Sequence, residues 1–311
     1  MTLSPGPGPW PPAPGPRKAD AALLLNTVLW GATFVLVKAA LSDVSPILFL
    51  ALRFSLATLA LLALFRGAGK QPWSWTAAGA GALAGAFLFS GYALQTLGLR
   101  FTSAPKSAFL TGLTSVMVPL LGALVYKNRP QVSEVVGVLV ATAGLGLMTL
   151  EGVTPLHGAT GSIGRGDALT LLGAAAFAAY IVTLGHFSGQ MSFEVLSVTQ
   201  IAAAAALALS MFWWAETPRL AWRPAVVWAI LITGLLCTAL AFTVQAWAQQ
   251  YTTSTRTALI YMLEPVFAWI TSFLVAGEGL SRRAAVGAAL ILGGVLLVEM
   301  KPWHARLHPS Q

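Results

Sequence analysis

Charged side chains are scarce in this chain of 311 residues. Asp, Glu, Lys and Arg together make up 9% of it, whereas an ordinary soluble domain contains about 25%. Hydrophobic residues make up 57%, and the mean hydropathy is +0.75. This balance excludes an ordinary soluble domain and predicts a protein that crosses a membrane several times.

Residues that bind metals or perform catalysis are also few. The single cysteine, Cys237, lies inside an apolar stretch, which excludes a disulfide framework and a metal site built from cysteines. A membrane enzyme acting on lipids would need a catalytic cluster near the interface, but neither an HExxH motif nor a nucleophile elbow occurs. The four histidines are dispersed, at His157, His186, His304 and His308. We therefore expect no metal, no cofactor and no enzymatic activity.

The net charge of +8 does not indicate a nucleic-acid partner. The 18 basic residues occur in ones and twos between apolar stretches, without a basic stripe, and such residues anchor helix ends at a membrane surface. The N-terminal segment MTLSPGPGPWPPAPGPRKAD has no apolar core long enough for a signal peptide. We expect residues 1–18 to form a disordered, Pro-rich cytoplasmic tail.

A helix needs about 20 apolar residues to cross a bilayer, and the chain divides into ten such stretches. The alternation of apolar and polar residues that membrane barrels require is missing from runs such as IAAAAALALSMFWW. The predicted fold is therefore an all-α polytopic membrane protein. Its ten transmembrane helices are expected near residues 21–40, 46–65, 76–98, 104–126, 132–150, 167–187, 193–214, 225–247, 254–276 and 282–299.

The distribution of basic residues predicts the orientation in the membrane. The first half favours a cytoplasmic N-terminus, and ten crossings return the C-terminus to the same side. The second half disagrees mildly, because four of its arginines fall on the predicted outer side. The inner residues are Arg17, Lys18, Arg66, Lys70, Lys127 and Arg129, the outer ones of that half Lys38, Arg100 and Lys106, and the discordant four Arg219, Arg223, Arg282 and Arg283.

The two halves of the sequence repeat one another. YALQTLGLRFTSAPKSAFLTGL from Tyr92 matches FTVQAWAQQYTTSTRTALIYML from Phe242 at a constant offset of 150. That offset pairs Gln95 with Gln245, Lys106 with Arg256, Gly137 with Gly287 and Gly144 with Gly294, while an offset of 147 pairs Asp20 with Asp167 and Arg53 with Gln200. We predict one five-helix repeat at residues 19–150, a loop at 151–165, a second repeat at 166–300 and a tail at 301–311.

Five helices are an odd number, so the second repeat enters the membrane from the opposite side. Such a 5+5 inverted-topology repeat is the architecture from which many secondary transporters obtain alternating access, with a central cavity near the midplane between the halves. A duplicated scaffold without a transport path and a channel are the other interpretations of this pattern.

Polar residues inside a membrane are costly and usually face a cavity or another helix. Ser107, Thr111 and Thr114 share one helical face, and their repeat counterparts are Thr257, Tyr261 and Glu264. The eighth helix adds a stripe of Thr238, Phe242, Gln245 and Gln249. Single Ser or Thr residues often only join helices. The predicted substrate-binding residues are Asn26, Trp30, Tyr92, Gln95, Thr111, Tyr180, Phe242, Gln245, Tyr261 and Glu264.

Two charged residues lie deep in the predicted helices. Arg53 is seven residues past Pro46, about 10 Å along its helix, and is interpreted chiefly as a structural partner for other polar groups. Glu264 either exchanges protons or holds a substrate ammonium group, or it caps a second half-helix, because Pro265 breaks the hydrogen-bond ladder. Pro119 predicts a second kink, in the fourth helix.

Three stretches together resemble the EamA-like branch of the drug/metabolite transporter superfamily: LLNTVLWGATFVLVKAAL, ILFLALRFSLATLALL and LEPVFAWITSFLVAGEGLSRRAAVGAALILGGVLL. The resemblance covers nearly everything after the tail. It implies a 5+5 inverted repeat with a central cavity, cytoplasmic termini and export of small metabolites, amino acids and toxic compounds among them. The matching motif residues are Trp30, Gly31, Arg53, Glu264, Pro265 and Glu278, whereas Asn128 replaces the acidic residue usual after the fourth helix.

We therefore expect an exporter in the bacterial cytoplasmic (inner) membrane that works by alternating access. The aromatic residues proposed for the cavity suit flat or cationic substrates, which favours amino acids with aromatic or large apolar side chains. A broad-specificity drug or toxic-cation exporter and a metabolite importer of the same fold are the alternatives. The expected partners are a small-molecule substrate and the lipid bilayer, the expected state is a monomer, and Glu264 leaves proton coupling open.

Overall fold

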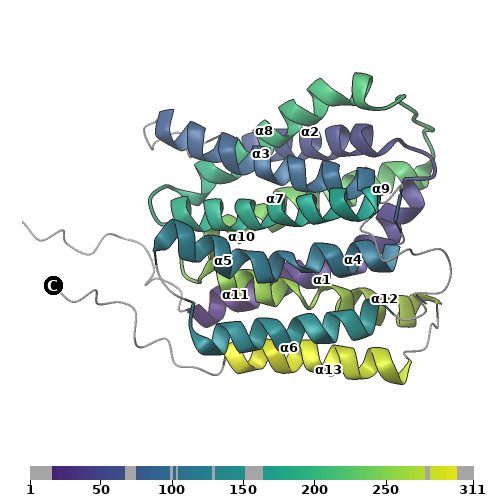
Figure 1. Cartoon of the computed structure of the whole chain (residues 1–311). Helices are drawn as coiled ribbons and strands as arrows, with labels where there is room; N and C mark the ends of the chain where they lie inside the picture. Colours follow the sequence, from purple (N-terminus) through teal and green to yellow (C-terminus); the bar gives the residue numbers. More distant parts are fainter. Residues whose placement is uncertain are drawn as a thin grey trace, which may run out of the picture.

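The computed structural model describes residues 16–66, 75–98, 101–102, 104–127, 130–150, 164–276 and 281–299. Within these ranges all regular secondary structure is helical, and one isolated β-bridge joins Val44 and Leu220. Figure 1 shows most of the helices lying along a common axis. The elements are α1 (Pro16–Ala40), α2 (Pro46–Leu64), α3 (Trp75–Gly98), α4 (Ala104–Gly112), α5 (Thr114–Tyr126), α6 (Val132–Thr149), α7 (Arg165–Ser188), α8 (Phe193–Ala215), α9 (Pro224–Gly234), the π-helix η2 (Leu235–Leu240), α10 (Ala241–Ala248), α11 (Ser254–Tyr261), α12 (Glu264–Ala276) and α13 (Arg282–Glu299).

Seven helical segments of the described part are long and apolar enough to cross a membrane. They coincide with seven of the predicted spans, which makes the chain a multi-pass helical membrane protein. The segments are Pro46–Leu64, Trp75–Gly98, Ser107–Tyr126, Val132–Thr149, Arg165–Ser188, Phe193–Ala215 and Pro224–Ala248.

The first helix begins earlier than its apolar stretch. α1 starts at Pro16 rather than near residue 21, because proline is favourable in the first turn of a helix, where its missing N–H costs nothing. Arg17 and Lys18 are exposed in that first turn, so residues 16–18 of the predicted tail are helical. Residues 1–15 lie outside the described part.

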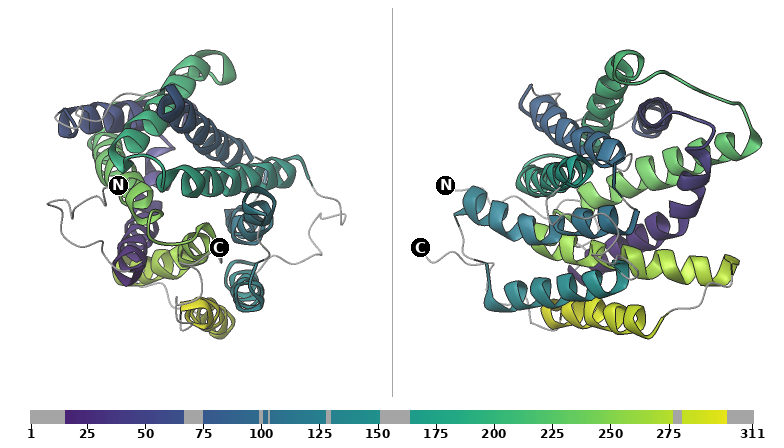
Figure 2. Two further views of the ribbon diagram at one scale, coloured as in Figure 1. Left: turned by 90° about the vertical axis from the view of Figure 1, so that its left-hand side faces the viewer. Right: turned by 45° about the vertical axis from the view of Figure 1, so that its right-hand side comes forward.

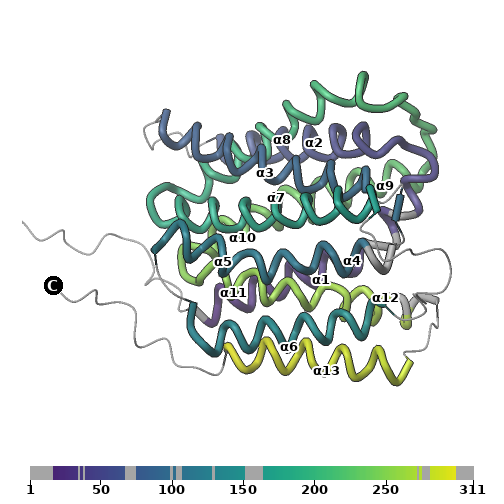
Figure 3. Tube along the Cα trace, viewed as in Figure 1, coloured from purple at the N-terminus to yellow at the C-terminus, as the bar shows by residue number. Residues whose placement is uncertain are grey.

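Three predicted spans are interrupted. The fourth is divided between α4 and α5, and the ninth between α11 and α12, while the eighth passes from α9 through η2 to α10. In the Cα trace of Figure 3, the α4–α5 pair and the α11–α12 pair cross the view in opposite directions. Interrupted backbone at membrane depth is tolerated where protein buries it or where it lines a cavity.

The main apolar core joins α2, α3, α7 and α8. Its fully buried side chains include Phe54, Leu88, Leu184 and Ile201. A second cluster joins α6, α11 and α13 through residues such as Leu259 and Ile291. Because lipid tails are as apolar as these side chains, close packing rather than transfer from water holds such helices together.

Two glycine pairs bring α6 and α13 into backbone contact along one edge of the molecule, as Figures 1 and 2 show. A Cβ atom on Gly137 would lie 2.8 Å from the Gly294 carbonyl oxygen, and one on Gly287 would lie 2.5 Å from that of Gly144. Gly137 corresponds to Gly287 at the offset of 150, and Gly144 to Gly294. Exchanging each glycine for its counterpart therefore gives the same contact again.

A second pair of matching contacts ties α1 and α7 to the starts of other helices. Thr252 donates to Asp20 at 2.8 Å, and Arg256 forms an ion pair with the same carboxylate at 3.4 Å. Thr102 donates to Asp167 at 2.7 Å. We call these the Asp20 contact and the Asp167 contact.

The segment after α8 closes over the start of α2. Glu216 accepts hydrogen bonds from the backbone N–H groups of Ile47 and Leu48, at 3.1 and 2.8 Å. These N–H groups have no partner within their own helix, so the carboxylate completes the first turn of α2. Arg223 and Asp43 form an ion pair at 3.5 Å beside it.

Candidate functional site

The π-helix η2 lies where side chains from α1 and α2 reach the eighth span. The Trp30 indole donates to the Cys237 carbonyl at 2.9 Å, and the Asn26 amide donates to the Ala241 carbonyl at 2.7 Å. A π-helix shifts the hydrogen-bond register and often marks a functional position. Here the shift brings backbone carbonyls within reach of two residues that the sequence predicted as substrate-binding.

Arg53 is buried between the second and eighth spans, with 5% of its surface exposed. Its Nε donates to the Thr238 hydroxyl at 2.5 Å, and its Nη2 donates to the Cys237 carbonyl at 3.2 Å. The guanidinium also lies 5.0 Å from the ring centroid of Tyr92. A buried charge is costly unless it is hydrogen-bonded, and these contacts offset that cost.

Four of the predicted aromatic residues meet in one place, which we call the aromatic cluster: Trp30, Tyr180, Phe242 and Tyr261. The Trp30 ring is 4.8 Å from Tyr261 and 5.5 Å from Phe242, and Phe242 is 5.9 Å from Tyr180. The residues come from α1, α7, α10 and α11. The Tyr261 hydroxyl is buried, and no described residue hydrogen-bonds to it. Tyr92 belongs to the same core and lies against Phe177 at 5.2 Å.

Gly31 explains why a glycine follows Trp30. A Cβ atom there would lie 2.8 Å from the Ala268 backbone nitrogen and 2.9 Å from the Glu264 carbonyl oxygen. Real Cβ atoms do not approach backbone so closely, so only glycine lets α1 cross α12 at this depth. The crossing places the Trp30 ring beside the interruption of the ninth span.

The ninth span breaks between Tyr261 and Glu264. Leu263 donates to the Ile260 carbonyl at 3.0 Å, in a tighter turn than the α-helix makes, and its own carbonyl accepts from Val266 and Phe267. Glu264 is the first residue of α12 and Pro265 the second, a position where proline is well tolerated. The partly buried Glu264 carboxylate is within electrostatic range of Arg53, but these two residues form no ion pair within 4.0 Å.

The fourth span is interrupted six residues before Pro119, where the sequence predicted a kink. Pro119 lies inside α5, and the interruption is at Leu113. Leu113 donates to the Leu110 carbonyl at 3.2 Å, and its carbonyl accepts from Val116 and Met117. This is the hydrogen-bond pattern of Leu263, which lies 150 residues later, and it forms without a proline.

A chain of side-chain hydrogen bonds leads away from the aromatic cluster. Tyr180 donates to Gln245 at 3.4 Å, Gln245 donates to Gln249 at 3.2 Å, and Gln249 donates to Ser254 at 3.4 Å. We call these four residues the glutamine chain. The other predicted glutamine, Gln95, donates to Thr111 at 3.0 Å.

The structure thus brings most of the predicted residues together, with Gln95 and Thr111 as a separate hydrogen-bonded pair. Arg53 links Tyr92 to the aromatic cluster, because its Nη2 donates to the Tyr92 hydroxyl and to the Cys237 carbonyl that Trp30 also reaches. The residues that meet around the cluster, the π-helix and the break of the ninth span are Asn26, Trp30, Tyr92, Tyr180, Phe242, Gln245, Tyr261 and Glu264. Asn26, Tyr180, Phe242 and Gln245 are fully buried, whereas Trp30, Tyr92, Gln95, Thr111, Tyr261 and Glu264 are partly buried. The aromatic cluster is therefore tightly packed in this conformation.

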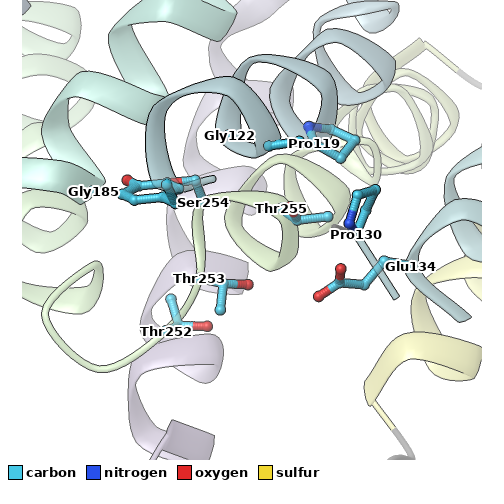
Figure 4. A pocket seen from close by; sticks show the side chains of 11 residues that line it. Pro119, Gly122, Pro130, Glu134, Gly185, Thr252, Thr253, Ser254 and Thr255 are labelled. Carbon is cyan, nitrogen blue, oxygen red and sulfur yellow. The ribbon is translucent and has the colours of Figure 1, made fainter. Parts of the chain in front are cut away.

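A cavity of about 260 Å³ lies elsewhere, where α5 ends and α6 and α11 begin. Figure 4 shows its lining from close by. Pro119 is part of that lining, but the ten predicted substrate-binding residues, all within the described ranges, are not. The lining is Pro119, Gly122, Ala123, Tyr126, Pro130, Glu134, Gly185, Thr252, Thr253, Ser254 and Thr255.

Several residues of the site are not among the ten predicted substrate-binding residues. Thr238 and Gln249 were recognised from the sequence as part of the polar stripe of the eighth helix, but were not included in that set. The Cys237 carbonyl gives no side-chain signal, because the π-helix alone makes it an acceptor. Glu134 and Thr252 to Ser254 flank apolar stretches and resemble ordinary helix ends. The motif residue Glu278 and the substituted Asn128 lie outside the described residues.

Known membrane transporters resemble this chain in sequence. The model of the EamA-like transporter family matches residues 17–150 and again residues 164–300. An uncharacterized transporter of Archaeoglobus fulgidus is 34% identical over 91% of this chain and 86% of its own length. YyaM of Bacillus subtilis, also named an uncharacterized transporter, is 26% identical over 88% of this chain and 91% of its own length.

A solved crystal structure has the same fold. It superposes with a TM-score of 0.74 at 20% sequence identity, covering 91% of this chain and 96% of the other. At that identity the likeness concerns the fold alone. The family match covers nearly all of the chain in two consecutive parts, and the Archaeoglobus relative extends over the same residues. The chain therefore belongs to the EamA-like transporter family of the drug/metabolite transporter superfamily.

Proposed function

We propose that this transporter exports amino acids with aromatic or large apolar side chains across the bacterial cytoplasmic membrane by alternating access. The observation that carries the proposal is the aromatic cluster, in which Trp30, Phe242 and Tyr261 meet beside an interrupted helix. Aromatic faces stack on flat rings and attract cations. Buried amides such as Gln245 add groups that bind ammonium and carboxylate.

Matching contacts support an inverted repeat of two five-helix halves, at residues 19–150 and 166–300. The glycine contacts between α6 and α13, the Thr–Asp contacts and the breaks at Leu113 and Leu263 each occur twice at the repeat offsets. A contact that repeats when its partners are exchanged is the signature of a two-fold relation. We infer ten crossings, with both termini on the cytoplasmic side.

In alternating access, the packed aromatic cluster must open when the substrate binds. A substrate that replaces the contacts of Trp30 with Phe242 and Tyr261 must separate α1 from α10 and α11. The breaks at Leu113 and Leu263 lack part of the helical hydrogen-bond ladder, so bending there costs less than in an intact helix. The two interrupted spans are therefore the proposed moving parts.

Transport into proteoliposomes tests the substrate. We expect protein-dependent flux of labelled phenylalanine, tryptophan and leucine, and a loss of most of it in Trp30→Ala. Labelled glutamate and empty liposomes are the controls. Flux of an aromatic organic cation without flux of any amino acid would favour a drug exporter. Flux of neither class would contradict the proposal, and rates beyond a carrier's turnover would indicate a channel.

Glu264 is proposed as the coupling residue, because it is the acidic group at the break beside the cluster. Glu264→Gln keeps the size of the side chain but cannot exchange a proton. If protons drive transport through this residue, the variant loses the dependence of flux on a pH gradient. If it transports at the wild-type rate with the same dependence, Glu264 serves only as the first residue of α12.

A further inference from the structure

Arg53 uses only part of its capacity to donate hydrogen bonds. A guanidinium carries five N–H donors, one on Nε and two on each Nη. The Arg53 Nε donates to Thr238, and its Nη2 donates to the Cys237 carbonyl and, at 3.4 Å, to the Tyr92 hydroxyl. No described residue accepts from Nη1, so the two donors of that nitrogen remain free on a buried cation.

The positive charge of Arg53 is not neutralised by an adjacent acidic group. Its acceptors are two hydroxyl groups and a backbone carbonyl, all uncharged. No carboxylate of the described residues lies within 4.0 Å of the guanidinium. A buried charge is costly when no opposite charge accompanies it. A negatively charged ligand would therefore gain more from this arginine than from one that already has an acidic partner.

Glu264 is the acidic group of the same centre. Its carboxylate accepts no hydrogen bond from a described residue, and it is within electrostatic range of Arg53 without lying within 4.0 Å of it. Trp30 connects the two charges, because its indole donates to the Cys237 carbonyl that Arg53 also reaches, and its neighbour Gly31 packs on the Glu264 backbone. Two opposite charges therefore share one centre without pairing directly.

The free atoms of this centre are not sealed off. In the described part, the enclosed polar side-chain atoms that lack a partner belong to residues other than Arg53 and Glu264, so the free atoms of these two residues keep some accessible surface. Tyr92 is partly buried, and its hydroxyl accepts from Arg53 while its own O–H has no acceptor among the described residues. It therefore adds a further free donor beside the guanidinium.

Tyr92 also connects this donor group to the start of α5. Its ring contacts Phe177 of α7 at 5.2 Å. About one turn earlier in α7, the Ala174 carbonyl accepts from the hydroxyl of Thr114, the first residue of α5, at 3.1 Å. A negative group bound to the donors beside Tyr92 would therefore lie on the α5 side of the centre.

We propose that Arg53 and Tyr92 form the subsite for the carboxylate of the substrate, while Glu264 binds its ammonium group. The two charged groups of an α-amino acid are carried by one carbon atom, so a single ligand completes both partners, which a simple amine or a simple acid cannot do. The assignment deepens the proposed function and rests on it for the aromatic or apolar side chain. The chemical class it fixes is a zwitterionic α-amino acid.

Binding of three ligands that share a phenyl ring tests the subsite without requiring transport. Phenylalanine carries both charges, phenethylamine lacks the carboxylate, and 3-phenylpropionate lacks the ammonium group. Isothermal titration calorimetry of the purified protein in detergent measures each dissociation constant. We expect the wild type to bind phenylalanine about tenfold or more tightly than either analogue, as hydrogen bonds made by charged groups predict.

Arg53→Gln removes the positive charge and is expected to weaken binding of phenylalanine and 3-phenylpropionate about tenfold or more, whereas phenethylamine should bind equally or more tightly. Because Arg53 also supports the π-helix, Tyr92→Phe is the second variant, which removes only a hydroxyl group and should weaken the two carboxylates about three- to tenfold. Glu264→Gln is expected to give the reverse pattern, with weaker binding of phenylalanine and phenethylamine only.

The matched controls replace the same residue types outside the centre. Arg223→Gln changes an arginine whose side chain is 69% exposed. Tyr126→Phe removes a hydroxyl that donates to the Val182 carbonyl. Neither should change the ratio of the three dissociation constants.

The outcomes separate this subsite from the function on which it rests. If Arg53→Gln and Tyr92→Phe weaken phenylalanine and phenethylamine equally, the two residues only support the fold, and the subsite is overturned even if amino acids are transported. Failure of all three ligands to bind the wild type would overturn it as well. A loss of affinity confined to the two carboxylates supports the subsite even if the proteoliposomes show no export.

Discussion

At the scale of single residues, Trp30 makes the contacts of the site and its neighbour Gly31 allows the close helix packing that these contacts need. Trp30 donates to the Cys237 carbonyl and packs on Tyr261, and it reaches both because Gly31 lets α1 approach the backbone of α12. The sequence marked the two residues as a motif. Only the structure shows that the glycine sets the depth at which the indole lies.

Gly31→Val is expected to destabilise the protein by about 1–3 kcal/mol, the range for overpacking. The added atoms collide with backbone of α12, which cannot move aside as a flexible side chain would. Thermal unfolding in detergent measures the effect. Gly79→Ala in α3 is the control, because a Cβ atom there meets nothing within 4 Å, and equal destabilisation of both variants would contradict the explanation.

Arg53 provides a second prediction at this scale. Arg53→Met removes the donors to Thr238 and Cys237, and we expect a loss of stability of about 1.5–3 kcal/mol, as for hydrogen bonds made by a charged group. Arg53→Lys should recover only part, because an ammonium group cannot reproduce the planar donor set. Arg223→Met is the control, since that side chain is 69% exposed and exposed ion pairs contribute little. A neutral effect of Arg53→Met would mean that the π-helix does not depend on it.

At the scale of elements, the sequence predicts one of the two breaks better than the other. Pro265 predicts the break of the ninth span, because proline is common near a helix start. Leu113 gives no such signal, and the proline of the fourth span, Pro119, lies where α5 continues. The repeat offset was the better guide, since residue 263 minus 150 is residue 113. The π-helix η2 was beyond prediction, because a register shift within LLCTAL changes no composition.

Pro265→Ala is expected to restore one backbone donor and to stiffen the junction of α11 and α12. We therefore predict slower transport with equal or higher thermal stability, a combination that separates a hinge from a simple structural role. Pro119→Ala is the matched control, since Pro119 lies within a continuous helix, and it should change the rate less. A larger effect of Pro119→Ala on transport would show that the fourth span bends at the proline after all.

At the scale of the whole molecule, the Asp20 and Asp167 contacts lie at opposite ends of the proposed inverted halves. The sequence paired Asp20 with Asp167 and Lys106 with Arg256, but it could not say that Thr252 and Thr102 would be their partners, because each contact joins segments that are distant in the chain. The general fold class and the family were readable from apolar stretches and motifs. Which residues meet at the centre depended on helix crossings, which the sequence does not encode locally.

Alternating access predicts opposite effects of weakening these two contacts. Asp20→Asn removes the ion pair with Arg256 and should loosen the end of the molecule that holds the cavity. A thiol placed in the cavity wall by Ala123→Cys is then expected to react severalfold faster with neutral methyl methanethiosulfonate. Asp167→Asn weakens the contact with Thr102 and should lower that rate by favouring the opposite opening. Both variants must keep near-native thermal stability for the comparison to hold. Changes in the same direction would contradict a two-ended mechanism.

The break at Leu113 and the break at Leu263 have an electrostatic consequence. Each places the start of one half-helix, with its partial positive charge, and the end of another, with its partial negative charge, in the membrane interior. Glu264 neutralises the start of α12, whereas α5 begins with the uncharged Thr114. The two halves therefore share the same backbone break but differ in the electrostatic field at that break. An amino acid held between the breaks would therefore have one preferred orientation, with its carboxylate toward α5 and its ammonium group toward Glu264.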